Sequence, residues 1–154
     1  MSKSLVIASG NRGKLAEFAR LLEPLGFNLK TQTELGISEA DEPHPTFVEN
    51  ALAKARHAAR ESGMAALADD SGICVPALGG APGVISARYA GEPKSDVANN
   101  ARLVRELQSH EDKSAYYHCV LVYLRHADDP QPVIAEGGWK GEIIADARGQ
   151  GGFG

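Results

Sequence analysis

Residues 5–14 read LVIASGNRGK, and this stretch decides how the chain begins to fold. The first four residues are apolar, as in a buried strand, and the pattern after Lys14 is that of an amphipathic helix. The Ser-Gly-Asn between them favours a tight turn. Its N–H groups, the positive end of the helix dipole and Lys14 would face one point. The stretch therefore predicts a phosphate site, and hence a nucleotide ligand; the alternative is an ordinary turn with Asn11 as helix N-cap.

Length and composition indicate a single globular domain spanning residues 1–154. Of the 154 residues, 43% are hydrophobic, enough for a substantial core. The formal net charge is −4 with acids and bases interleaved, which argues against a nucleic-acid polymer as partner. Cys74 and Cys119 stand alone in apolar segments, so we expect reduced thiols and a cytoplasmic protein. The longest apolar run, 119–124, is too short to span a membrane.

Hydrophobic spacing predicts alternating strands and helices in the first half of the chain and mainly strands in the second. We expect strands at 5–8, 28–31, 65–68, 116–124, 133–135 and 139–145, the fourth covered on both faces and the last two joined by a turn at 136–138. We expect helices after Asn11, from Thr46 to Gly63 with a Thr46–Glu49 capping box, and from Ser95 or Asp96 with Val97, Ala101, Val104 and Leu107 facing inward. This order predicts an α/β domain with a mixed sheet.

Two adjacent acidic residues, Asp69 and Asp70, follow the apolar segment 65–68. Neighbouring carboxylates repel each other, and Mg²⁺ relieves the repulsion because it binds hard oxygen ligands together with waters and phosphates. One carboxylate would hold the metal while the other positions or deprotonates a water molecule. The alternative is a solvated Asp-Asp-Ser-Gly turn at the end of a strand.

The acidic loop at 33–45 offers a second metal carboxylate. Glu42 is the best candidate because Pro43 stiffens the chain beside it, whereas Asp41 and Glu49 stay open as alternatives. For Glu49 we favour the capping box over a ligand role.

The C-terminal residues 149–154 read GQGGFG. Such a segment lets the backbone wrap a ligand while Phe153 stacks on a base, and the alternative is a frayed tail.

A series of motifs occurs in order along the chain. They are Ser9-Gly10-Asn11-x-x-Lys14, Thr46-Phe47-x-Glu49-Asn50-Ala51, Ala68-Asp69-Asp70-Ser71-Gly72, Gly79-Gly80-Ala81-Pro82-Gly83 with Ser86-Ala87-Arg88-Tyr89, and Gly151-Gly152-Phe153-Gly154. With these motifs the chain resembles the inosine triphosphate pyrophosphatase family, the non-canonical purine NTP pyrophosphatases. The resemblance extends over the whole chain.

The resemblance implies an elongated α/β homodimer with a long twisted sheet, two lobes and a nucleotide cleft between them. It implies Mg²⁺-dependent hydrolysis of ITP, dITP, XTP and dXTP to the monophosphate and pyrophosphate. It also makes Asp70 the catalytic acid/base and a metal ligand, with Asp69 and Glu42 as further metal carboxylates. The substrate-binding residues that it implies are Ser9, Gly10, Asn11, Arg12, Gly13, Lys14, Ser71, Phe153 and Gly154.

The chain departs from the family after Gly154. Members of the family continue with a Tyr-Asp-Pro segment, a lysine and a Ser-His-Arg motif, so we expect a C-terminal part to be missing. Two other functions stay open: a nucleotide-binding protein without catalysis, and a pyrophosphatase for other altered nucleotides such as modified pyrimidines.

Overall fold

The computed structural model describes residues 3–151, and the chain forms two compact units. Unit 1 comprises residues 1–70 and 120–136, and unit 2 comprises residues 71–119 and 137–154. The helices and strands are β1 (Lys3–Ile7), α1 (Arg12–Leu22), β2 (Phe27–Thr31), α2 (Phe47–Ser62), β3 (Ala65–Cys74), α3 (Asp96–Leu107), β4 (Ser114–Leu124) and β5 (Val133–Glu142), with 3₁₀ helices η1 (Glu23–Leu25), η2 (Pro76–Leu78) and η3 (Gly83–Arg88).

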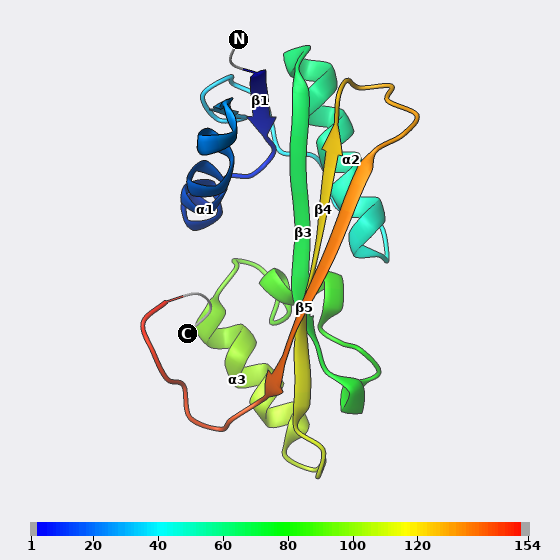
Figure 1. Ribbon diagram of the computed structural model, residues 1–154. Helices are drawn as coiled ribbons and strands as arrows, with labels where there is room; N and C mark the ends of the chain where they lie inside the picture. Colours follow the sequence, from blue (N-terminus) through cyan, green and yellow to red (C-terminus); the bar gives the residue numbers. More distant parts are fainter. Residues whose placement is uncertain (1–2, 152–154) are drawn as a thin grey trace. The chain divides into compact units, whose positions relative to one another are not determined.

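The strands form one sheet in the order β2-β1-β3-β4-β5. β1 is parallel to both β2 and β3, whereas β4 and β5 run in opposite directions (Figure 1). The predicted α/β class with a mixed sheet is confirmed. No helix within residues 3–151 is long and apolar enough to cross a membrane.

In unit 1, the alternation of side chains along β1 places one helix on each face of the sheet. Val6 and Ala8 pack with the alanine-rich face of α2. Leu5 and Ile7 face the other way and pack with α1 (Figure 1). Because four of the five buried side chains of α2 are alanines, the helix lies close to the strands.

The register of β1 against β3 positions the start of α1. Ile7 pairs with Leu67, and the Ala8 N–H donates to the Leu67 carbonyl at 2.9 Å. The turn after Ala8 therefore lies beside the next residues of β3, which are Ala68 and Asp69.

The structure places the end of the third strand later than expected and excludes the alternative of a solvated turn at residues 69–72. β3 continues through them to Cys74, and every residue from Ala66 to Asp70 is buried. Two adjacent acids indicate a turn when only local preference is considered, because an unpaired buried charge is costly. Here lysines from α1 and α2 lie against the acids, so the strand continues.

The turn expected at 136–138 is also absent, because β5 runs unbroken from Val133 to Glu142. Gly138 lies next to the Tyr117 carbonyl of β4, where an added Cβ would make an ordinary contact at 3.4 Å. The fourth strand was expected to be covered on both faces, but Tyr116 and Tyr117 of β4 are exposed.

In unit 2, the inward face of α3 agrees with the expected one at Leu107 and differs elsewhere. The buried residues are Asn99, Leu103 and Leu107, whereas Val97 is 81% exposed. Leu103 and Leu107 pack with Val75, Tyr89 and Ala115. The Asn99 amide donates to the Ala87 carbonyl at 2.9 Å and accepts from the Ala90 N–H at 2.7 Å. A hydrophobic pattern assigns asparagine to the surface. Asn99 is buried because the backbone of the preceding loop supplies hydrogen-bond partners for its side-chain amide.

Candidate active site

The turn between β1 and α1 is capped by its own side chains. Asn11 is the N-cap of α1, and its Oδ1 accepts from the Lys14 N–H at 3.1 Å. Ser9 Oγ accepts from the Asn11 N–H at 3.1 Å. The ordinary capping role considered for Asn11 is therefore present. Arg12 and Gly13 are the first residues of α1, where the backbone N–H groups have no acceptor within the helix.

The Lys14 side chain joins this turn to β3. Its Nζ lies 2.5 Å from Oδ2 of Asp69, whose side chain is only 3% exposed. The structure thus brings together the predicted anion turn and the predicted acidic pair, which are far apart in the sequence. The ion pair also neutralises one of the two adjacent carboxylates.

The neighbouring carboxylate, Asp70, is not neutralised in the same way. Its Oδ2 is buried and, within residues 3–151, has no hydrogen-bond partner. Burial raises the pKa of Asp70 to about 6, and the nearby Glu42 carboxylate adds to the rise, while Lys54 and Asn50 oppose it. A buried carboxylate with an unsatisfied oxygen and a raised pKa is a feature of catalytic and metal-binding positions.

Lys54 on α2, which is not among the predicted site residues, organises the same site. Its Nζ lies 2.6 Å from Oε1 of Glu42 and donates to the Asp69 carbonyl at 2.8 Å. The signal in the sequence was a lysine between alanines on the helix face that holds Ala51, Ala55 and Ala58. A charged residue on such a buried face requires a partner.

The loop before α2 brings Glu42 to Asp70, and Asn50 fixes that loop. The Asn50 side chain accepts from the His44 N–H and donates to the His44 carbonyl, both at 3.0 Å. The predicted capping box is confirmed, because Thr46 Oγ1 donates to the Glu49 carboxylate at 2.5 Å and accepts from its N–H at 3.3 Å. The Glu49 carboxylate is therefore engaged in the capping box. The remaining alternative, Asp41, is exposed.

The carboxylates fit a metal that takes few protein ligands. The part of the chain that the structure describes contains no group of three or more side chains able to hold a metal ion. Mg²⁺ needs only one or two carboxylates, because waters and substrate phosphates complete its shell. The free Oδ2 of Asp70 and the adjacent Glu42 carboxylate meet that requirement.

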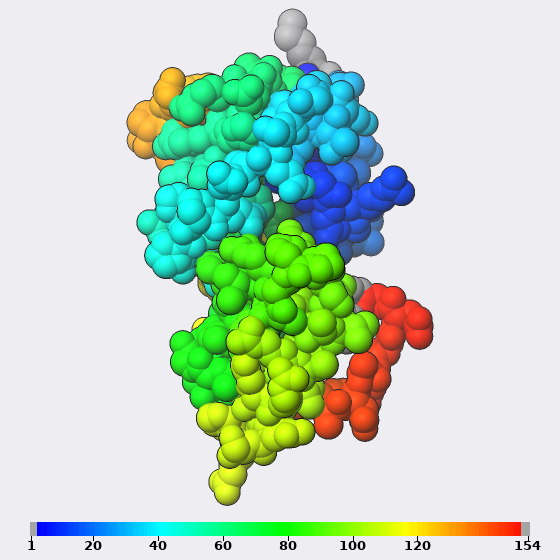
Figure 2. Space-filling view, turned by 180° about the vertical axis from the view of Figure 1, so that it is seen from behind, coloured from blue at the N-terminus to red at the C-terminus, as the bar shows by residue number. Residues whose placement is uncertain are grey.

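The other predicted residues lie around this centre or beyond the described chain. Ser71 follows Asp70 in β3, Gly10 lies in the exposed turn, and Arg12 is the exposed first residue of α1. Phe153 and Gly154 lie outside the described residues. Figure 2 shows the loop at 33–45, in light blue, beside the blue segment that follows β1.

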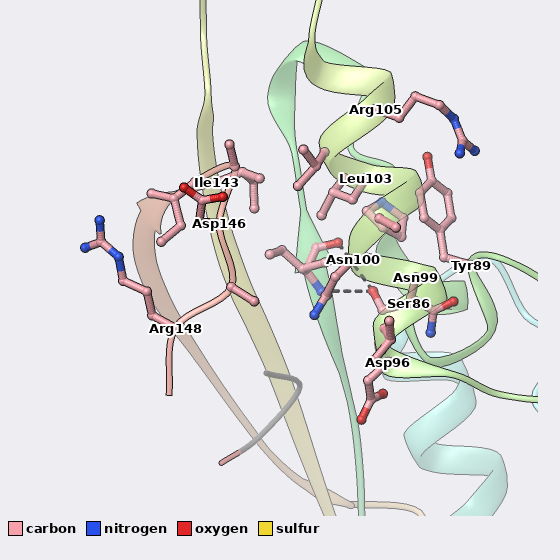
Figure 3. Close-up of a pocket in the computed structure, with 18 of the residues that line it drawn as sticks. Ser86, Tyr89, Asp96, Asn99, Asn100, Leu103, Arg105, Ile143, Asp146 and Arg148 are labelled. Carbon is pink, nitrogen blue, oxygen red and sulfur yellow. Dashed lines mark hydrogen bonds between the residues drawn. The ribbon is translucent and has the colours of Figure 1, made fainter. Parts of the chain in front are cut away.

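A separate cavity of about 910 Å³ lies within unit 2, between α3 and residues 142–151 (Figure 3). Val97, Ala101 and Val104, which were expected to face the core, line this cavity instead. The charged residues in its lining are Asp96, Arg105, Glu142, Asp146 and Arg148. Compared with this mixed lining, the paired carboxylates of unit 1 are the stronger candidate for metal chemistry.

Comparison with known proteins identifies the family. The model of the Ham1 family matches residues 5–154. The chain belongs to the Ham1 family. This confirms the family resemblance that the motifs indicate.

Other Ham1 family relatives are close in sequence and in structure. A dITP/XTP pyrophosphatase of Ralstonia nicotianae is 70% identical over 155 residues, which cover 99% of this chain and 77% of the relative. One from Nitrosomonas europaea is 67% identical, covering 97% of this chain and 74% of the relative. The structure of a HAM1 protein from Coxiella burnetii superposes with a TM-score of 0.93 at 44% identity, covering 99% of this chain and 78% of that one.

Proposed function

We propose that this Ham1 family protein hydrolyses non-canonical purine nucleoside triphosphates, dITP and XTP among them, to the monophosphate and pyrophosphate. The observation that carries the proposal is the meeting of an anion-binding turn with a buried carboxylate pair. Lys14 Nζ lies 2.5 Å from Oδ2 of Asp69, and the next residue of β3 is Asp70, whose Oδ2 has no hydrogen-bond partner within residues 3–151. Relatives that are 60–70% identical bear the name dITP/XTP pyrophosphatase.

In this proposal, residues 9–14 bind the triphosphate. The N-terminus of α1 and the Lys14 ammonium neutralise charge on the phosphate oxygens, which grows as the bond after the α-phosphate breaks. Asp69 holds Lys14 in place before the substrate binds. Ser71, next to Asp70 in the strand, also contacts the substrate.

Asp70 is the acid/base of the reaction. Its buried carboxylate orients or deprotonates the water that attacks the α-phosphorus, and pyrophosphate leaves. Mg²⁺, when bound, would be held by Asp70 and Glu42 and would supply Lewis-acid stabilisation of the phosphate oxygens. The family resemblance adds Asp69 as a metal carboxylate, although its side chain is paired with Lys14 here. Lys54 is a positioning residue, because it holds both the Glu42 carboxylate and the Asp69 backbone.

The remaining parts of the proposal rest on the family resemblance. By that resemblance, Phe153 would stack on the purine and Gly154 would be a further substrate-binding residue. The two units form one domain, through which β3 and β4 run continuously. The protein is a cytoplasmic homodimer with no membrane or nucleic-acid partner, and light scattering of the purified chain tests the dimer.

A substrate panel tests the function and separates its alternatives. Pyrophosphate release is measured with Mg²⁺ and dITP, XTP, dGTP or a modified pyrimidine triphosphate, alongside the shift in melting temperature that each produces. We expect fast release from dITP and XTP. A melting shift with dITP but no release from any substrate would favour a binding protein without catalysis. Preference for the pyrimidine would favour the other pyrophosphatase function.

A further inference from the structure

The loop at 33–45 places a further carboxylate over the proposed anion turn. A Cβ built on Gly10 would lie 3.1 Å from Oε1 of Glu39. Gly10 does not have a positive φ, so its backbone conformation does not require glycine. The distance shows instead that the Glu39 carboxylate lies close over the backbone of the turn, where an added Cβ would make it shift by a few tenths of an ångström.

Anchors on either side of Glu39 hold its backbone near the turn. Before it, the Ile37 N–H donates to the Gln32 carbonyl at 2.9 Å, and Gln32 is buried. The Ser38 carbonyl lies 2.9 Å from Nε2 of His57 on α2, which ties the loop to that helix. After it, His44 is held by the Asn50 amide. The position of Glu39 is therefore set by the fold of unit 1.

The negative charge of Glu39 would repel a triphosphate that carries no metal ion. Glu39 and the triphosphate would carry like charges at the same turn, and the Lys14 charge is already shared with Asp69. A divalent cation bound to the phosphates removes most of that repulsion and gives the carboxylate a favourable partner. The effect of Glu39 on binding therefore depends on whether the triphosphate carries a divalent cation.

We propose that Glu39 is a specificity-determining residue that makes the anion turn select the metal-complexed triphosphate over the metal-free one. The inference rests on the proposed function, because it takes residues 9–14 as the triphosphate site. It assigns a role to an exposed loop residue that none of the sequence motifs contains.

Binding of α,β-methylene-ITP, which cannot be cleaved after the α-phosphate, tests the proposal by calorimetry with EDTA and with Mg²⁺. Glu39→Gln removes the charge and keeps the shape, and we expect about three- to tenfold tighter binding in EDTA with little change in Mg²⁺. Glu39→Lys should tighten binding in EDTA further. The control is Glu17→Gln, which removes an exposed charge from α1, and it should bind as the parent does.

Kinetics give a second readout. With dITP and limiting Mg²⁺, Glu39→Gln should lower KM while kcat at saturating Mg²⁺ stays unchanged. If Glu39→Gln and Glu17→Gln bind alike in EDTA while the parent enzyme remains active, the role of Glu39 is overturned and the proposed function stands. If the parent binds the analogue in neither condition and releases no pyrophosphate, both are overturned.

Discussion

Two buried aspartates of unit 1 show how differently the same residue is treated in two places. Asp129, in the loop between β4 and β5, is 1% exposed and accepts from Arg125 Nε at 2.7 Å and from the N–H groups of Arg125 and Gln131 at 3.0 Å. The hydrogen bonds from Arg125 hold the pKa of Asp129 well below its ordinary value.

Asp70, in the middle of β3, is 6% exposed, and one of its oxygens has no hydrogen-bond partner within residues 3–151. Burial raises its pKa to about 6. Burial alone therefore does not separate a structural acid from a functional one; the satisfaction of its oxygens does. Asp129 should serve stability, and Asp70 should serve chemistry at a cost in stability.

The largest expected effect is the loss of activity in Asp70→Asn. The variant keeps the shape but can neither deprotonate water nor hold a metal as a carboxylate, so kcat should fall by at least about 10³-fold. The measurement is pyrophosphate release from dITP with Mg²⁺, with circular dichroism to check the fold. Asp129→Asn is the matched variant and should keep its kcat below its melting temperature. Equal losses of kcat in the two variants would contradict the distinction between a functional Asp70 and a structural Asp129.

The next effect concerns substrate binding through Lys14. Lys14→Ala removes the cation at the anion turn and leaves the Asp69 carboxylate buried without its partner, so KM for dITP should rise about 10- to 100-fold. Initial rates over a range of dITP concentrations measure it. Lys30→Ala, on the exposed part of β2, is the control and should leave KM unchanged. Unchanged KM and kcat in Lys14→Ala would remove this residue from the site.

Stability should depend more on Asp129 than on Asp70, the reverse of the order expected for activity. Because its pKa is lower in the folded protein, the carboxylate stabilises the fold above its ordinary pKa, and this contribution is lost as the pH falls through the folded-state value. Asp129→Asn should therefore lower the melting temperature by several degrees at pH 7. The difference from the parent should shrink in strong acid. Thermal melts from pH 7 to pH 2 would reveal a pH-independent difference if the account of Asp129 is wrong.

The smallest effect is a gain in stability in Asp70→Asn without metal. The pKa of Asp70 is raised from 3.8 to about 6, so above pH 6 its charged form opposes folding, and below pH 3.8 the penalty disappears. Replacement by asparagine should add about 1–2 kcal/mol to the free energy of unfolding at pH 7.5 in EDTA. Urea unfolding at pH 7.5 and pH 4 measures it, with the gain fading at the lower pH. A loss of stability at pH 7.5 would mean that the carboxylate is satisfied after all.

The sequence predicted the features that depend on neighbouring residues. The strand, turn and helix at residues 5–14 and the Thr46–Glu49 capping box were foreseen because their signals lie within a few positions of each other. The acidic pair was selected as a candidate for the same reason, although its strand was expected to end there.

Features that depend on tertiary partners escaped the sequence analysis. β3 continues through Asp69 because Lys14, more than fifty positions away, neutralises it. Lys54 was missed because its partners, Glu42 and the Asp69 carbonyl, come from a loop and a strand that no periodicity connects to α2. Apart from Leu107, the buried face of α3 was misassigned, because the buried Asn99 is satisfied by loop backbone.

The most direct test of the central claim is an NMR titration of the Asp70 side-chain carboxyl carbon in the wild-type protein, without and with Mg²⁺. The account predicts a pKa of about 6 in the metal-free protein, because burial leaves the carboxylate short of partners. It predicts a clear fall in that pKa when Mg²⁺ is added, because a bound cation favours the charged form. A pKa near the ordinary value of 3.8 that Mg²⁺ does not change would contradict the account.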